Sequence, residues 1–320
     1  MFLNRRNPLA MGLRIVVLGA THVDYTLLVD QLPKVGETVT GKTLKLSLGG
    51  KGANQAVAAT RLGAETYLVS RVGNDSMGRD ALEGLIRNGV KTDYVTIDEE
   101  ATTGVAFIFV GTNGRNMIGV FSGADDKVCE DDFKRVEGIL KDTDTLLVQL
   151  EIPLTTVRYA VAKAKEMDVT VILNPAPAKP LDSKTLSNID VITPNEVELS
   201  ELTHMELRGS DDYVKACRKL IERGVKTVVV TLGKQGAMLV TEDETYHVEG
   251  IRVRSVDTTG AGDAFNAALA FMLARGSSYE EAVKLANVAG ALATTKVGAQ
   301  EALPTFSEIN NFLSSFRIQP

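Results

Sequence analysis

The chain has 320 residues, of which 44% are hydrophobic and 24% charged, a composition that suits a globular protein with a sizeable α/β core. Its formal net charge of -6 leaves no basic excess for a nucleic-acid backbone, which argues against nucleic acid as the main partner. The two cysteines and three dispersed histidines exclude a disulfide framework and a His/Cys zinc site, and no apolar run is long enough to span a membrane. We therefore expect a cytoplasmic protein with neither a nucleic-acid nor a membrane partner.

The first stretch of the chain predicts a tail followed by a buried strand. Residues 1–12 include Arg5 and Arg6 but lack the apolar segment of a secretory signal, so we expect a flexible tail before a domain over residues 13–320. The apolar run at 14–19 is typical of a strand with helices on both faces. No helix-opening G-x-G-x-x-G follows it, which weakens a dinucleotide-binding interpretation.

Beyond residue 65, strand and helix patterns alternate along the chain. Strands are expected at 66–72, 145–150, 170–173, 191–193 and 227–231, and helices at 76–88, 154–167, 196–202, 211–223, 279–295 and 307–316. Such alternation predicts a mostly parallel, doubly wound sheet. A hairpin is expected at 237–249, and no repeat or linker divides the chain, which indicates one domain.

Two early strand pairs do not fit this alternation. Residues 25–29 and 38–48 flank a turn with Pro33 and Gly36, and residues 105–121 contain a Gly-rich hairpin signal. We expect both pairs to form a small antiparallel flap outside the main sheet. The lid strands then fall within about 24–48 and 103–122.

The segment 257–263, with sequence DTTGAGD, is the strongest chemical signal. It lies between an expected strand at 251–256 and an expected helix at 264–274. Free N–H groups and the dipole make a helix N-terminus favourable for phosphate, and the small residues at 260–262 permit close approach. Asp263 is interpreted as a base that removes a proton from an attacking hydroxyl. The alternative is that it only caps the helix.

Further polar side chains follow expected strands, where open α/β sheets bind ligands. Two of them have structural alternatives: Glu151 could be a helix-start carboxylate before Pro153, and Asn195 with Glu198 could be a capping pair. The members of this edge are Asp24, Glu151, Asn195, Glu198, Thr231 and Asp263.

The segment GGKGAN at 49–54 lacks the Ser or Thr of a P-loop, which disfavours a P-loop NTPase. Its glycines could instead bring the backbone against a polyhydroxylated ligand, with Lys51 and Asn54 donating hydrogen bonds. A tight joint between strand and helix is the alternative. For His22, a place near the substrate or simple exposure on a loop is a better interpretation than a metal ligand.

The segments GGKGAN and DTTGAGD resemble the two signatures of the ribokinase (PfkB) carbohydrate kinase family, and Asn195-x-x-Glu198 is similar to its N-x-x-E motif. The resemblance runs from about residue 14 to residue 316. It implies a ribokinase-like three-layer α/β/α sandwich with a mostly parallel central sheet and a β-strand lid that pairs subunits into a homodimer. It also implies ATP-dependent phosphorylation of the 5-hydroxyl of D-ribose.

The resemblance implies a role for each matching position. Asp263 would be the base, and the N–H groups of the residues before it would hold the γ-phosphoryl group: Gly260, Ala261 and Gly262. The sugar would be bound by His22, Asp24, Gly50, Lys51, Asn54 and Glu151. The positions expected to contact ATP are Asn195, Thr231, Gly233, Gly236, Gly262 and Asn287.

Two ions are implied in the same way. Glu198 would act on Mg²⁺ indirectly, and a potassium ion beside the anion hole would be held by Asp257, Thr259, Ala293, Lys296, Gly298 and Ala302. Two positions depart from the family pattern: His22 replaces an asparagine, and Ala302 replaces a serine. The sugar could therefore be 2-deoxyribose, another sugar or a nucleoside, and a non-enzymatic sugar-binding regulator is a further alternative.

Overall fold

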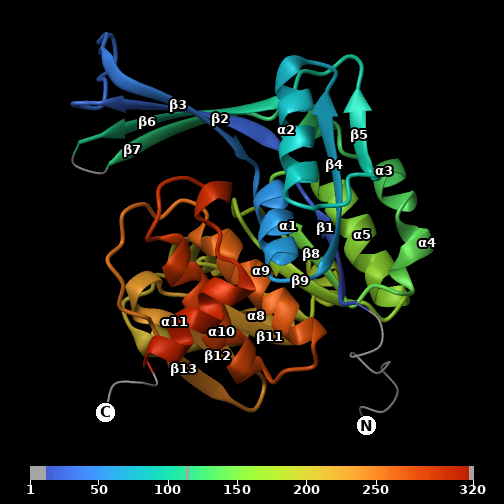
Figure 1. Cartoon of the computed structure of the whole chain (residues 1–320). Helices are drawn as coiled ribbons and strands as arrows, with labels where there is room; N and C mark the ends of the chain where they lie inside the picture. The colour runs from blue at the N-terminus through green and yellow to red at the C-terminus, as the bar shows by residue number, and fades with distance from the viewer. Residues whose placement is uncertain (1–11, 113–114, 317–320) are drawn as a thin grey trace.

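The computed structural model describes residues 12–112 and 115–316 (Figure 1). Apart from Gly12, the expected tail lies outside these residues, as does the end of the expected domain at 317–320. The described chain forms a large sheet between two layers of helices, and a second sheet projects from it (Figure 1). This confirms the predicted α/β sandwich.

The main sheet contains nine of the described strands. In spatial order they are β13 (Thr245–Glu249), β12 (Gly236–Val240), β11 (Thr227–Thr231), β10 (Val191–Ile192), β9 (Thr170–Asn174), β8 (Thr145–Gln149), β1 (Arg14–Leu18), β4 (Glu65–Gly73) and β5 (Val95–Asp98). All neighbours pair in parallel except β12, which is antiparallel to both β11 and β13. The predicted hairpin at 237–249 therefore extends the parallel sheet at one edge.

Helices cover both faces of this sheet because its strands are apolar on both sides. In β1, Ile15 and Val17 pack into one buried cluster, and Val16 and Leu18 pack into the other. The first cluster includes α1 (Lys51–Arg61), α2 (Ser76–Arg87), α9 (Ala261–Ala274), α10 (Tyr279–Ala293) and α11 (Phe306–Phe316). The second includes α3 (Glu130–Lys134), α4 (Glu137–Leu140), α5 (Leu154–Glu166), α6 (Ser183–Leu186), α7 (Glu196–Thr203) and α8 (Ser210–Glu222). No helix among the described residues is long and apolar enough to cross a membrane.

The lid is a four-stranded sheet that projects away from the body (Figure 1). Its order is β3 (Gly41–Gly49), β2 (His22–Val29), β6 (Gly104–Gly111) and β7 (Asn116–Phe121). Both predicted strand pairs are present, but the flap is not wholly antiparallel: β2 pairs in parallel with β6. This long-range pairing joins the two hairpins into one sheet.

Other expectations are corrected by the structure. Residues 251–256 are not a strand, because they have no strand partner; the Val256 N–H instead donates to the Thr294 carbonyl at 2.7 Å. The strand β5, the short helices α3, α4 and α6, and three 3-10 turns, η1 (Gly123–Lys127), η2 (Gly233–Gln235) and η3 (Gln300–Ala302), were not expected from the sequence.

Candidate active site

A cavity of about 410 Å³ lies between the lid and the carboxyl ends of β8 to β11. The lid contributes apolar side chains such as Ile108 and Val120 as well as His22 and Asp24 of β2, and the sheet edge contributes further polar ones. Most of the predicted site residues line this cavity: His22, Asp24, Gly50, Lys51, Asn54, Glu151, Asn195, Glu198, Thr231, Thr259, Gly260, Gly262 and Asp263. The structure thus gathers residues from both ends of the chain at one edge of the sheet.

Asp263 is the most constrained of these side chains. Its two carboxylate oxygens each accept a hydrogen bond of 3.0 Å, one from Asn54 Nδ2 and one from Gln55 Nε2. Burial raises the pKa of Asp263, while the Lys51 ammonium and the two amides act in the opposite direction. The cap of α9 is Gly260, without a side-chain cap bond, so the interpretation of Asp263 as a helix cap is wrong.

The N-terminus of α9 opens into the same cavity. Gly260 has φ 77°, a left-handed conformation that favours glycine, and it begins the turn that leads into the helix. Of the three expected phosphate donors, the Ala261 N–H donates to the Thr258 carbonyl at 3.2 Å. Gly260 and Gly262 line the cavity, at a helix end whose dipole favours an anion.

The N-terminus of α1 carries a second charged group. Gly50, its cap residue, has φ 88°, and a Cβ there would lie 2.5 Å from the Ala20 carbonyl oxygen. The Lys51 N–H donates to Glu151 Oε2 at 2.8 Å, and Lys51 Nζ lies 3.7 Å from Glu151 Oε1. Glu151 is therefore a helix-start carboxylate, but for α1 and not for the helix that follows it in sequence.

His22 lines the same cavity and lies between two carboxylates. Its Nε2 is 3.4 Å from Asp24 Oδ1, and its Nδ1 is 3.3 Å from Asp125 Oδ2. Burial acts to lower the pKa of His22, but the hydrogen bond with Asp125 and the charges of Glu151 and Asp24 outweigh it and raise the pKa to about 9. Burial also raises the pKa of Asp24 and of Asp125 to about 6, although His22 opposes both shifts.

Only some of the residues expected to contact ATP line the cavity. Asn195 and Glu198 form a capping box, in which Glu198 accepts from the Asn195 N–H at 2.9 Å and Asn195 accepts from the Glu198 N–H at 2.8 Å. The capping interpretation is thus confirmed, and a β-bridge sets Asn195 beside Thr231 in the cavity.

The remaining three expected ATP contacts do not line the cavity. The Asn287 amide donates to the carbonyls of Val248 and Glu249, at 3.2 and 3.4 Å. Gly236 approaches the Val248 carbonyl so closely that a Cβ there would lie 2.1 Å from its oxygen. Gly233, with φ 54°, begins the turn η2 after β11.

Part of the expected potassium site is assembled around Asp257. Its Oδ1 accepts from the Thr259 N–H at 3.0 Å and from the Thr259 hydroxyl at 2.7 Å, and its Oδ2 accepts from the Gly298 N–H at 2.9 Å. Burial acts to raise the pKa of Asp257, but these hydrogen bonds outweigh it and the pKa is lowered. A carboxylate held ionised fits a monovalent cation. The Lys296 ammonium pairs with Glu308 at 2.7 Å, which leaves the backbone carbonyl of Lys296 as its candidate ligand.

Four polar residues of the site were missed as contacts by the sequence reasoning. Asp125 holds His22, and Gln55 holds Asp263; Gln149 and Asn174 in turn bond to Gln55, at 2.6 and 3.2 Å. Gln55 lies directly after the GGKGAN segment, which is the one signal that could have found it. Asp125 has no comparable signal, because its partner is 103 positions away.

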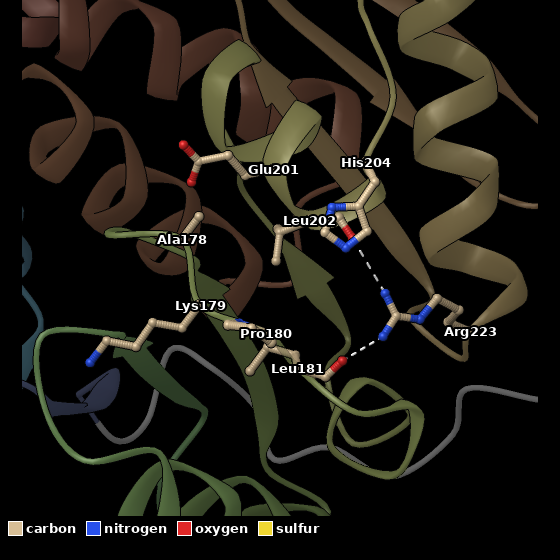
Figure 2. A pocket seen from close by; sticks show the side chains of 8 residues that line it. All are labelled: Ala178, Lys179, Pro180, Leu181, Glu201, Leu202, His204 and Arg223. Atoms are coloured by element: carbon tan, nitrogen blue, oxygen red, sulfur yellow. Dashed lines mark hydrogen bonds between the residues drawn. The ribbon is translucent and has the colours of Figure 1, made fainter.

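A separate pocket of about 290 Å³ lies between residues 178–181 and the helices α7 and α8 (Figure 2). Arg223 donates from its guanidinium to the carbonyls of Leu181 and Leu202, which closes one side of it (Figure 2). None of the predicted site residues lines this pocket.

Comparison with known proteins tests the family that the motifs predict. The family model described as pfkB family carbohydrate kinase matches residues 13–306. The chain belongs to the pfkB family of carbohydrate kinases. This confirms the prediction from the two Gly-rich segments.

Several named relatives of this kinase match nearly its whole length. A ribokinase of Haemophilus influenzae is 39% identical over 299 residues, which cover 93% of this chain and 98% of that protein. A deoxyribokinase of Salmonella typhi is 37% identical over 301 residues, which cover 94% and 98%. Both names fit a sugar kinase, and they differ in the sugar.

Solved structures confirm the fold of the kinase. The structure of Arabidopsis thaliana ribokinase complexed with ribose and ATP superposes with a TM-score of 0.88 at 34% identity, over 95% of this chain and 99% of that one. The Thermotoga maritima ribokinase gives a TM-score of 0.86 at 34% identity, over 94% and 99%.

Proposed function

We propose that this kinase transfers the γ-phosphoryl group of ATP to the 5-hydroxyl of D-ribose, giving D-ribose 5-phosphate and ADP. The observation that carries the proposal is the position of Asp263, a buried carboxylate held by two amides in the same cavity as a helix N-terminus. The chain's similarity to ribokinases, one of them complexed with ribose and ATP, supports this choice of substrates.

In this proposal Asp263 accepts the proton of the sugar hydroxyl while the bond from that oxygen to the γ-phosphorus forms. The bond between the γ-phosphorus and the bridging oxygen breaks, and ADP leaves. Gly260 and Gly262 offer backbone N–H groups at the N-terminus of α9, where negative charge develops, whereas the Ala261 N–H would join the anion hole only by leaving the Thr258 carbonyl. Lys51 adds a positive charge close enough to act on Asp263.

Two ions complete the proposed site. Magnesium, held in part through Glu198, would neutralise charge on the ATP phosphates. A potassium ion would be held by Asp257, Thr259 and the carbonyl groups of the 293–302 segment, with Ala302 in place of a side-chain ligand. Asn195, Thr231, Gly233, Gly236 and Asn287 would surround the nucleotide, and the apolar lid residues would keep water from competing for the γ-phosphoryl group.

A second substrate is favoured by two observations. A deoxyribokinase is 37% identical to this chain, and His22, which replaces an asparagine of the family pattern, lines the cavity. Values of kcat/KM for ribose, 2-deoxyribose, other pentoses and nucleosides decide between them. Ribose should give the highest kcat/KM. If 2-deoxyribose gives a higher kcat/KM than ribose, 2-deoxyribose is the substrate.

We also propose a cytoplasmic homodimer that pairs through the lids. The lid exposes large apolar side chains, among them Leu44, Leu46, Phe107 and Ile118, which are each more than half exposed in a single subunit. Burial of this surface against a second copy would account for its composition.

A coupled assay of ADP release with ribose, MgATP and K⁺ tests the proposed reaction. We expect turnover that requires both substrates. The proposal fails if ADP release is the same with and without any sugar.

A further inference from the structure

A chain of buried amides leads from the central sheet to the Asp263 carboxylate. Gln149, the last residue of β8, donates through Nε2 to Gln55 Oε1 at 2.6 Å. Gln55, on α1, then donates through Nε2 to Asp263 Oδ1 at 3.0 Å. Both glutamines are 0% exposed, and the hydrogen bonds between buried amides of this kind favour one arrangement; Gln149 Oε1 alone of their amide atoms has no partner among the described residues.

The acceptors around Gln55 decide which end of its amide faces Asp263. An ionised carboxylate only accepts hydrogen bonds, so Gln55 must present its NH₂ group, which also reaches Asn174 Oδ1 at 3.2 Å. The Gln55 carbonyl then faces the Gln149 NH₂ group. Gly19 leaves room for this arrangement, since a Cβ there would lie 2.0 Å from Gln149 Oε1. The sheet therefore fixes the orientation of the donor.

Gln55 differs from Asn54 in its access to the cavity. Asn54 lines the cavity and donates to the other Asp263 oxygen, so it is placed to touch a bound sugar as well. Gln55 does not line it. It contacts two residues that do, Asp263 at 3.0 Å and Asn174 at 3.2 Å, and the shorter of these contacts is to the proposed base.

The charges around Asp263 make this donor important. Burial raises the pKa of Asp263, Lys51 acts against it, and Glu151 acts with it. Asp24 is a further acidic group on the same cavity. A protonated Asp263 could not accept the hydroxyl proton, so each N–H donated to it favours the form that the reaction needs.

We propose that Gln55, oriented by Gln149, is a positioning residue that aims the Asp263 carboxylate at the sugar hydroxyl and holds it ionised. The inference rests on the proposed role of Asp263 as the base. A purely structural role would predict that loss of the amide changes stability and leaves the titration of Asp263 where it was.

The test compares Gln55→Met with the wild-type kinase, because methionine has a similar length and no N–H donor. Gln149→Met removes the group that orients Gln55 and provides a second variant. Thr156→Val is the matched control: it removes a buried hydrogen bond of 2.8 Å to the Val128 carbonyl, in α5 and away from the cavity. Circular dichroism confirms that each variant is folded.

The first readout is the Asp263 carboxyl titration by ¹³C NMR on protein labelled at aspartate, with Asp263→Asn to assign the signal. We expect Gln55→Met to raise the Asp263 pKa by about one unit or more, Gln149→Met to raise it by less, and Thr156→Val to leave it unchanged. An Asp263 pKa in Gln55→Met within about 0.2 units of wild type overturns the inference.

The second readout is the pH profile of kcat with ribose and MgATP. We expect its acid limb to move upward with the NMR titration in Gln55→Met, with little change in the KM for ATP. A shifted titration with an unmoved acid limb shows that Gln55 controls the carboxylate but that Asp263 is not the base. In that case the proposed function of Asp263 fails and the contact with Gln55 loses its role in catalysis.

Discussion

Replacement of Asp125 by asparagine tests the charge of His22 in the proposed sugar site. The change keeps the shape of the side chain and an oxygen that can accept from the Thr21 N–H, now 2.8 Å from Asp125 Oδ1. It removes the negative charge 3.3 Å from His22 Nδ1. Because that carboxylate is a main cause of the raised His22 pKa, the pKa should fall from about 9 toward its ordinary value of 6.5.

The magnitude follows from these two values. At pH 7.5 a group with a pKa of 9 is about 97% protonated, and one with a pKa of 6.5 is about 9% protonated. His22 would then lose the charge that opposes the raised pKa of Asp24, which lies 3.4 Å from it. A neutral His22 is also a weaker hydrogen-bond donor toward a sugar hydroxyl than the charged imidazolium. At about 1.4 kcal/mol per tenfold change, loss of one charge-assisted hydrogen bond raises the sugar KM roughly tenfold.

The measurement is the KM for ribose between pH 6.5 and 8, for wild type, Asp125→Asn and the control Asp126→Asn. The wild-type KM should be nearly constant, because His22 stays charged over this range. In Asp125→Asn the KM should rise with pH as His22 loses its proton. Asp126 is exposed, and its variant should follow wild type. A constant, wild-type KM in Asp125→Asn would refute the reasoning.

Two further predictions concern the cation and the lid. Asp257→Asn should raise the K⁺ concentration for half-maximal activity at least about fivefold at constant ionic strength, since it removes the charge that Thr259 and Gly298 now hold in place; an unchanged K⁺ requirement would count against the cation site. The double variant Leu46→Lys and Phe107→Asp should convert the dimer to a monomer by light scattering at micromolar concentration, because both side chains are more than half exposed in one subunit; a wild-type that is itself monomeric would contradict the proposed pairing.

Local patterns predicted the regular part of the fold well. The apolar run at 14–19 is β1, and both lid hairpins are present because turn residues and alternation are local signals. The parallel pairing of β2 with β6 was missed, since it joins segments about 80 residues apart and depends on the whole fold. Residues 251–256 alternate as a strand would, but they have no partner strand.

The site residues that belong to a recognisable sequence motif could be predicted. Lys51, Asn54 and Asp263 meet in the cavity as expected. Gln55 and Asp125 were not expected as contacts. Each acts on another side chain, and such a residue belongs to no motif with a characteristic spacing in the sequence. For Asn195 and Glu198 the sequence offered two interpretations, a capping pair or a part of the site. The structure contains the capping box, and both residues also line the cavity.

The most direct test of the account is kcat for Asp263→Asn with ribose and MgATP. The variant keeps the size of the side chain and removes the base, so kcat should fall by about 10²–10⁴-fold. Asp243→Asn, an exposed aspartate in the turn between β12 and β13, is the matched control and should keep the wild-type value. Binding of ATP, followed by calorimetry, should change little. A fall in kcat of no more than about tenfold would contradict the assignment of Asp263 as the base.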